Sequence, residues 1–303
     1  MSQSNFRQII KDYFACIISR KEVLIIYTWT TLIGLLITHR GFPPLDTMAI
    51  TLATISFTGM AVYFYNDLKD YEDDVLSKEY GNSTPSNRPL RQGRITTNRI
   101  YQFILFNGVL GLATAYLISI EVFALMTAFV VLGYLYSTEP FLFKKKFLMK
   151  QATIALGGLI SCIVGGFASG IITPSLLFFS AMSFFMFFGV NPIIDLRDME
   201  GDRVVGVKSF PVLWGPKFTV RLAITTLTAS MLANVLGYYQ FGFSSVLPVL
   251  GAIVLGATIW VIQPLLNKWE DSTFLNNTIT KRMHPLFLLI QLCYLIGSIP
   301  LGF

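Results

Sequence analysis

The chain has 303 residues, of which 53% are hydrophobic and 13% are charged, whereas an average soluble domain has about 25% charged residues. This shortage of charge excludes an ordinary soluble globular protein and indicates an integral membrane protein. Only two histidines are present, and the three cysteines are far apart with no C-x-x-C pair, which argues against a haem or zinc centre and against a disulfide.

The first 22 residues are polar and contain no apolar core followed by a small-residue cleavage site, so we predict no removable signal peptide. Nine apolar stretches then follow, each close to the ~20 residues that a helix needs to cross the hydrocarbon of a bilayer. We therefore predict an all-α membrane protein with about nine transmembrane helices in a single domain over residues 1–303. In chain order the stretches are 23–40, 45–65, 100–118, 120–137, 152–171, 173–193, 218–240, 245–265 and 284–302.

Basic residues predict the orientation of these helices. Of the 23 Lys and Arg residues, 22 lie in the N-terminal segment or in the loops after the second, fourth, sixth and eighth stretches, and only Arg40 lies on the other side. Because basic loops stay in the cytoplasm, we predict a cytoplasmic N-terminus and an outside C-terminus in a multi-pass protein of the cell membrane. The net charge of +6 follows from this topology and indicates no nucleic-acid partner.

Two acidic clusters follow the second and sixth apolar stretches, in loops that both face the cytoplasm in this topology. Their aspartates share the same steps of three and then four residues, and each member of the second cluster lies 128 residues after its counterpart. We interpret this as an internal duplication of a four-helix unit, roughly 20–150 and 151–282, with a final helix over 284–302. The aspartates are Asp67, Asp70 and Asp74 in the first cluster and Asp195, Asp198 and Asp202 in the second.

The spacing of these carboxylates indicates a metal site. If each helix continues into its cluster, residues at i, i+3 and i+7 share one face, where three negative charges repel one another unless a cation binds among them. Hard oxygen ligands suit magnesium, which keeps several waters and shares phosphate oxygens. Two such faces opposite each other would hold a diphosphate through bridging ions. Ordinary solvated loop charges are the alternative, and the equal spacing of the two clusters argues against it.

The residues around both clusters resemble a known family. Asn66–Asp74, with the pattern N-D-x-x-D-x-x-x-D, is followed by the run Asn87-Arg88-Pro89-Leu90, and Asp195–Asp202 is followed by Arg203 and the run Gly206-Val207-Lys208-Ser209. In these motifs and in helix count, nearly the whole chain is similar to the UbiA superfamily of membrane prenyltransferases. The resemblance implies a ring of nine helices around a central cavity that opens laterally to lipid. It also implies a prenyl diphosphate near the cytoplasmic side, held by two magnesium ions, with manganese as a substitute.

The resemblance further implies roles for individual residues. Four are expected to be the principal magnesium and diphosphate ligands, and three further aspartates are expected to bind or support the metal. Cations near the leaving diphosphate would stabilise its developing charge, although topology or contact with anionic lipids also explains basic loops. The principal ligands are Asn66, Asp70, Asp198 and Asp202, the supporting residues are Asp67, Asp74 and Asp195, and the candidate diphosphate-binding cations are Arg20, Arg88, Lys144, Lys145, Lys146, Arg203 and Lys208.

The loop after the fourth helix departs from the family pattern, in which a Tyr is often followed four residues later by a Lys. Here Tyr136 is followed by Pro140, and Lys144 is eight residues away, so which of the three neighbouring lysines contacts the diphosphate stays open. Aromatic residues near the acidic loops are expected to line a prenyl channel and to stabilise an allylic cation with their ring faces. These residues are Tyr63, Tyr65 and Phe188.

The expected reaction transfers a prenyl group, from geranyl to geranylgeranyl or longer, from its diphosphate to an acceptor, with the metals as Lewis acid and template. The catalytic candidates are Asp67, Asp70, Asp195 and Asp198, with Asp67 or Asp195 as the base. We predict an aromatic quinone precursor, such as a dihydroxynaphthoate, as acceptor because residues 70–74 resemble those of quinone-pathway members. A glycerol-phosphate lipid is the alternative acceptor. A membrane transporter is the alternative of a different class, but transporters bind near the bilayer midplane, where this chain has almost no ionisable residue.

Overall fold

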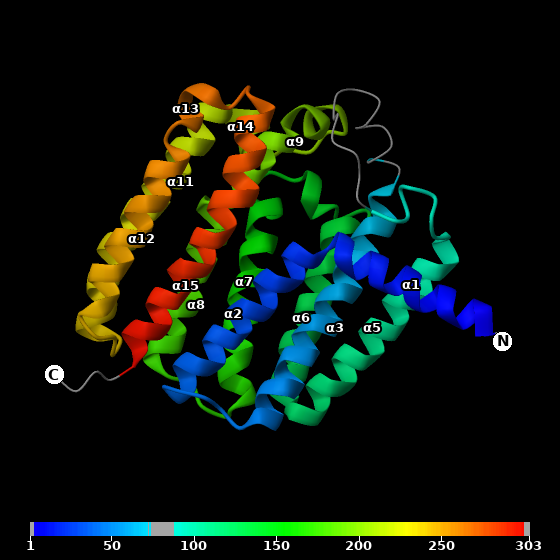
Figure 1. Cartoon of the computed structure of the whole chain (residues 1–303), viewed down its shortest axis with the longest axis horizontal. Coiled ribbons are helices and arrows are strands. Elements are labelled where there is room, and N and C mark those ends of the chain that lie inside the picture. The colour runs from blue at the N-terminus through cyan, green and yellow to red at the C-terminus, as the bar shows by residue number, and fades with distance from the viewer. Residues whose placement is uncertain (1–2, 72, 74–87, 300–303) are drawn as a thin grey trace.

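The computed structural model describes residues 3–71, 73 and 88–299, and over these ranges every regular element is a helix (Figure 1). The predicted all-α class is therefore confirmed. The longer helices are α1 (Gln3–Ser19), α2 (Lys21–His39), α3 (Leu45–Lys69), α5 (Thr97–Ile118), α6 (Ile120–Ser137), α7 (Met149–Ala168), α8 (Pro174–Gly189), α9 (Pro192–Val204), α11 (Pro216–Gln240), α12 (Val246–Ile262) and α15 (His284–Ser298). Shorter elements are a 3₁₀ helix (Phe143–Lys145), α10 (Phe210–Trp214), α13 (Leu265–Lys268), α14 (Ser272–Asn277) and a π-helix (Thr278–Met283).

Eight helical segments of the described chain are long and apolar enough to cross a bilayer, and they correspond to the first eight stretches predicted from the sequence. The sixth combines α8 with α9, which starts after a break at Val190 and Asn191. The ninth stretch begins at α15, whose 15 residues are fewer than the ~20 of a full span. However, α15 continues directly from the six-residue π-helix, so the continuous helical segment starts at Thr278 and not at the predicted residue 284. A total of nine spans and their orientation stay predictions.

Helix α1 lies ahead of the first predicted span and crosses α3 and α5 (Figure 1). One face, which includes Ile9, Cys16 and Ile17, packs against the apolar cluster formed with those two helices. The Tyr13 hydroxyl on the same face donates a hydrogen bond to Asn107 on α5 over 2.9 Å. Because α1 ends one residue before Arg20, this packing fixes the place where that arginine leaves the helix.

Helices α2 and α7 form the centre of the molecule and run parallel to each other. The Thr31 hydroxyl donates to the Ser161 carbonyl over 2.7 Å, and the His39 ring bonds the Ser169 hydroxyl over 2.7 Å. Both pairs are separated by 130 residues, close to the 128 residues between the acidic clusters. Two helices that begin the predicted repeat units are thus in register, an arrangement that a duplication would produce. The duplication itself stays a prediction.

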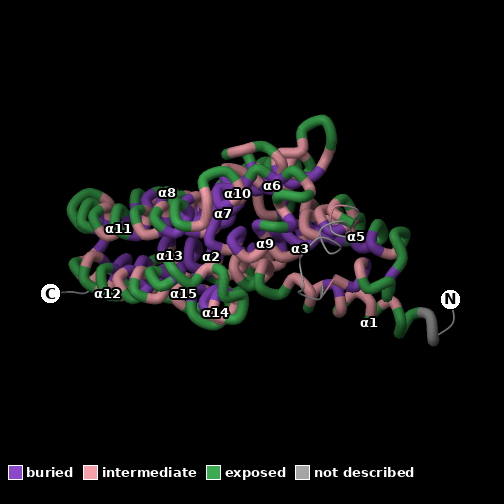
Figure 2. The backbone as a smooth tube through the Cα atoms, turned by 90° about the horizontal axis from the view of Figure 1, so that it is seen from above, coloured by how far each residue is buried: buried purple, intermediate pink, exposed green. Residues whose placement is uncertain are grey.

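The remaining long helices flank this central pair. Helices α3, α5 and α6 pack on one side, and α8, α11, α12 and α15 pack on the other, so the two sets lie at opposite ends of the long axis (Figure 2). Buried residues are concentrated along the central pair, α2 and α7, and along α8 beside it. The residues that follow α3 and α8 come together at one end of the bundle, on either side of the central pair.

Close packing of α2 on α7 depends on glycine. A Cβ added at Gly34 would collide with the main-chain carbonyl of Cys162, whereas a Cβ added at Gly59, inside α3, would meet nothing within 4 Å. We predict that Gly34→Ala destabilises the protein by about 1–3 kcal/mol, because backbone atoms cannot move aside as a side chain can. Gly59→Ala is the matched control, and it should be neutral or stabilising by up to about 1 kcal/mol because alanine favours helix. Thermal unfolding in detergent measures both, and equal melting temperatures would contradict the packing described here.

Candidate active site

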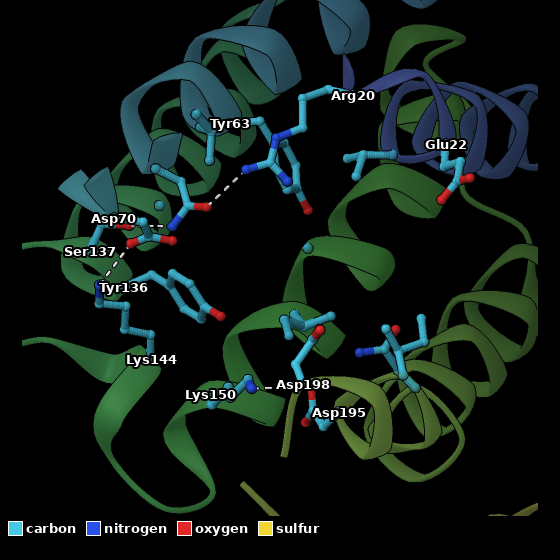
Figure 3. Close-up of a pocket in the computed structure, with 18 of the residues that line it drawn as sticks. Arg20, Glu22, Tyr63, Asp70, Tyr136, Ser137, Lys144, Lys150, Asp195 and Asp198 are labelled. Atoms are coloured by element: carbon cyan, nitrogen blue, oxygen red, sulfur yellow. Dashed lines mark hydrogen bonds and ion pairs between the residues drawn. The ribbon is translucent and has the colours of Figure 1, made fainter. Parts of the chain in front are cut away.

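A cavity of about 1200 Å³ opens at the end of the bundle where α3 and α9 carry the acidic residues (Figure 3). Side chains from both acidic clusters line it, together with cations that come from four separate segments. Asp70 and Arg20 lie on one wall, and Asp195 and Asp198 lie across from them (Figure 3). The structure therefore brings together the two clusters that are 128 residues apart in the sequence. Asp74 lies outside the described residues.

In the first cluster, Asp70 caps the C-terminus of α3, where its N–H donates to the Asn66 carbonyl over 2.8 Å. The Lys144 ammonium donates to Asp70 and to Asp73, each over 2.7 Å, and Lys145 donates to Asp73 over 3.0 Å. Burial raises the pKa of Asp73, but the two ammonium groups outweigh it and hold that pKa below its usual value. The Asn66 amide donates to Ser137 and leaves its oxygen toward Arg20 at 3.4 Å. The side-chain oxygens of this cluster are thus already paired with basic side chains of the protein.

Asp67 has a different position from Asp70. Its side chain is 5% exposed, is not among the residues that line the cavity, and forms salt bridges with Arg20 and, over 3.1 Å, with Arg88. Both arginines do line the cavity, and the Arg20 guanidinium lies 5.4 Å from the centre of the Tyr63 ring. In this position the carboxylate of Asp67 holds two guanidinium groups at the cavity wall. Burial lowers the pKa of Arg20, but the charge and hydrogen bond of Asp67, together with the charges of Tyr63 and Asp70, outweigh it and raise that pKa.

The second cluster lies on α9, where the i, i+3 and i+7 spacing places its aspartates on one face as the sequence implies. The Lys150 ammonium joins the first and last of them, 3.1 Å from Asp195 and 3.0 Å from Asp202. The amide of Gln151 donates to the other oxygen of Asp195 over 2.6 Å. Asp198, between them, is 39% exposed and bonds Arg197 over 3.2 Å.

Lys144, in the segment between α6 and α7, and Lys150, the second residue of α7, belong to one short stretch of chain that contains two residues other than glycine with positive φ. Leu142 has φ 38° and Leu148 has φ 63°, a backbone region that bulky residues rarely adopt and that is found most often at functional sites. Lys144 reaches the first cluster and Lys150 the second. The sequence pointed to the group Lys144–Lys146 but not to Lys150. The signal that could have found it is a lysine in the first turn of an otherwise apolar helix, where the helix dipole disfavours a cation.

The other basic residues are divided between the cavity and the surface. Arg88 and Arg91 line the cavity. Burial and then the nearby Arg20 charge lower the pKa of Arg88, and burial is the main cause that lowers the pKa of Arg91 to about 10. Arg203 pairs with exposed Glu200, Lys146 lies over the Phe143 ring, and Lys208 is exposed. Within the described chain, Lys145 and these three residues are not part of the lining.

Aromatic rings cover the apolar part of the cavity. Tyr63 is one of them, and the structure adds Tyr27, Phe129 and Phe187. The ring of Tyr27 stacks on Phe187 with centroids 6.1 Å apart and meets Phe129 edge-on at 5.6 Å. No sequence signal separates these rings from the many aromatic residues of a membrane protein, because their place in the cavity depends on helix packing.

The two other predicted channel residues lie away from the lining. The Tyr65 hydroxyl bonds Thr138 over 2.6 Å and its ring stacks on Tyr134, whereas Phe188 packs edge-on against Phe210.

The donor set fits a hard divalent cation. Carboxylate oxygens of both clusters and the Asn66 amide are the ligands that magnesium and manganese prefer. Within the described residues, however, no three acidic, histidine or cysteine side chains gather closely enough to hold one ion by themselves. An ion between these carboxylates would therefore complete its coordination shell with water and phosphate oxygens, which is how magnesium usually binds in proteins.

Comparison with known proteins decides the family. Residues 27–275 match the model of the UbiA prenyltransferase family. The chain belongs to this family. It is therefore a transferase of prenyl groups, and the transporter alternative is set aside.

Several relatives of this UbiA protein are named as digeranylgeranylglyceryl phosphate synthases. Digeranylgeranylglyceryl phosphate synthase of Thermococcus sibiricus is 25% identical over 272 residues, which cover 89% of this chain and 92% of that protein. A solved structure reported for digeranylgeranylglyceryl phosphate synthase in membranes superposes with a TM-score of 0.72 at 22% identity, covering 97% of this chain and 99% of the other. A UbiA homologue from Archaeoglobus fulgidus, bound to GPP and Mg2+, gives a TM-score of 0.72 at 18% identity and covers 94% and 99%. Both structural likenesses show the shared fold.

The position of Asp67 generates a prediction about stability. Asp67→Asn removes the charge that balances Arg20 and Arg88, and a buried guanidinium left without its partner costs about 3–5 kcal/mol. We expect a clear loss of melting temperature in detergent. Glu200→Gln is the matched control, since the Glu200 side chain is 60% exposed and pairs with exposed Arg203, and its effect should stay within about 0.5 kcal/mol. If Asp67→Asn melted like the unchanged protein, Asp67 would not be the residue that holds the two arginines.

Proposed function

We propose that this UbiA prenyltransferase transfers a prenyl group from its diphosphate to the free hydroxyl of a glycerol-phosphate lipid. This is the second of the two acceptors weighed from the sequence. The relatives named as digeranylgeranylglyceryl phosphate synthases favour it over the aromatic quinone precursor that residues 70–74 suggested.

The charge on the cavity wall supports an acceptor with its own phosphate. Arg20, Arg88 and Arg91 all line the cavity, and Arg20 lowers the pKa of both neighbours, although burial does so more strongly. Arg20 is thus close enough to repel the other two guanidinium groups, and a bound phosphate would add to the single negative charge that Asp67 already places between Arg20 and Arg88. Arginine is also well suited to phosphate because its planar group donates two parallel hydrogen bonds. A wall of this kind, beside a diphosphate site, suits a second phosphate better than a neutral aromatic ring.

The divalent ions would be held by Asn66, Asp70, Asp198 and Asp202, and when bound they supply Lewis acidity and neutralise the diphosphate. We propose two of them, with manganese able to replace magnesium, by analogy with the homologue that was solved with GPP and Mg2+. Asp74 and Asp195 would support this set.

The chain's own groups then promote the reaction. As the allylic C–O bond breaks, Lys144, Lys150, Arg20 and Arg88 balance the charge that develops on the leaving diphosphate. The faces of Tyr27, Tyr63 and Phe187 attract the allylic cation and keep water from reaching it. The hydroxyl oxygen of the acceptor then attacks the cation, an ether bond forms, and the hydroxyl proton passes to a carboxylate or diphosphate oxygen. We expect this chemistry on the cytoplasmic side of the membrane, because basic loops stay in the cytoplasm.

A direct assay of acceptors tests the proposal. We expect purified protein, given geranylgeranyl diphosphate and magnesium, to convert geranylgeranylglyceryl phosphate to a product that is heavier by one geranylgeranyl group, as detected by mass spectrometry. A parallel reaction with a dihydroxynaphthoate should give little or no product, and chelation of the metal should stop both. Prenylation of the aromatic acceptor alone would reject the proposed acceptor while leaving prenyl transfer intact.

Substitutions in the two clusters test the shared site. Asp70→Ala and Asp198→Ala should each abolish transfer while the protein stays folded and extractable, because both clusters act on one diphosphate. The double variant should be scarcely worse than either single one, since residues that act as a unit are not additive. Lys69→Ala is the control, because Lys69 is exposed, adjoins Asp70 and lies over the Tyr65 ring. Near-normal turnover of Asp198→Ala would show that the second cluster has no part in the reaction.

A further inference from the structure

The stretch from the loop after α6 to the first turn of α7 supplies one ammonium group to each acidic cluster. Lys144 bridges Asp70 and Asp73 at 2.7 Å from each, and Lys150 bridges Asp195 and Asp202 at 3.1 and 3.0 Å. Both lysines also line the cavity (Figure 3). Three of these four carboxylates, those of Asp70, Asp195 and Asp202, belong to the motifs that are expected to bind a metal.

Both lysines lie in positions that are unfavourable for a positive charge. Their side chains are only 8% and 10% exposed, so each ammonium has given up most of its water. Lys150 is the second residue of α7, where the positive end of the helix dipole repels a cation. The segment that carries them also includes left-handed Leu142 and Leu148. Costs of this kind are typical of residues kept for their function.

A divalent ion and an ammonium group cannot both take full advantage of the same carboxylate oxygens. An ion bound by Asp195 and Asp202 would lie close to the Lys150 ammonium, and like charges a few ångströms apart repel strongly in a partly desolvated site. The described residues also offer no group of three acids to hold an ion alone. Ions that bind here therefore need both further ligands and a new partner for the lysine. A diphosphate supplies both.

We propose that Lys144 and Lys150 compete with divalent metal for the two acidic clusters and move to diphosphate oxygens when the substrate binds. Metal ions then bind tightly only together with the diphosphate. This inference rests on the metal–diphosphate site of the proposed function, but not on the identity of the acceptor.

The proposal has a thermodynamic consequence. If the diphosphate removes the lysines from the carboxylates, it raises the affinity for metal, and by linkage metal raises the affinity for diphosphate by the same factor. Couplings of this type are usually about 5- to 150-fold. The lysines would therefore keep the site free of bound metal until a substrate arrives to use it.

Binding of Mn2+, followed by the loss of its free EPR signal, tests this without any acceptor or turnover. With the unchanged protein in neutral detergent, Mn2+ alone should bind weakly, and saturating inorganic pyrophosphate should tighten it by at least about fivefold. Lys150→Met should bind Mn2+ alone more tightly than the unchanged protein does, yet bind pyrophosphate more weakly, so the coupling shrinks. Lys144→Met should behave in the same way. Opposite changes in the two affinities distinguish competition from a structural role, which would weaken both.

The controls address long-range charge and folding. Lys69→Met removes the same charge one residue from Asp70, without a contact to a carboxylate in the described structure, and should leave the coupling unchanged. Lys150→Gln keeps hydrogen-bond donors but no charge, so it carries the same test if Lys150→Met fails to fold.

Tighter binding of Mn2+ alone by the Lys150 variants, together with weaker pyrophosphate binding, would support the proposal. Equal or weaker binding of Mn2+ alone would overturn the competition while the proposed acceptor assay could still succeed. If the unchanged protein bound no Mn2+ even with pyrophosphate, the metal–diphosphate site would be rejected, and this inference with it.

Discussion

A charge that leaves water needs a partner of opposite sign, and the cavity end of this bundle is organised by that requirement. Arg20 and Arg88 meet Asp67, Lys144 meets Asp70 and Asp73, and Lys150 meets Asp195 and Asp202. Each pair joins segments that are far apart in the sequence. The same ion pairs therefore keep the acidic clusters from repelling and hold the ends of α3, α7 and α9 around one cavity.

The ion pairs at the cavity follow the same register as the packing of α2 on α7. Arg20 precedes α2, Lys150 lies in the first turn of α7, and these two cations are 130 residues apart, like the contact pairs along the two helices. Their partners, Asp67 and Asp195, are 128 residues apart. The first aspartate of each cluster thus pairs with a cation at the start of α2 or α7, the helices that begin the two predicted units. Because α2 and α7 run parallel, both cations lie at the same end of the molecule. A duplication would produce this repeated pairing, although Asp195 lines the cavity and Asp67 does not.

Some features of the fold and of the site could be predicted from the sequence because they depend on patterns within one helix. Apolar length marked eight of the spans, and spacing by three and four marked the face of α9. Other features depend on how helices meet. Lys150 follows Leu148, whose φ of 63° no pattern of residue types reveals, and it contacts two aspartates on a separate helix. The rings of Tyr27 and Phe187 line the cavity while Phe188, next in the chain, turns away, since neighbouring residues on a helix point about 100° apart.

The change in polarity across the cavity suits the two amphipathic substrates of the proposed reaction. Its wall passes from ionised side chains, such as Asp70 and Lys150, to the aromatic rings of Tyr27, Phe129 and Phe187. A molecule with a phosphate at one end and an isoprenoid at the other fits this gradient in only one direction, because reversing it would bury charge against the rings. Donor and acceptor phosphates would then lie at the same end, where their repulsion needs cations between them. The arginines and lysines of the cavity wall can supply these cations. In the proposed exchange, Lys144 and Lys150 would move to the diphosphate when the metal ions replace them on the carboxylates.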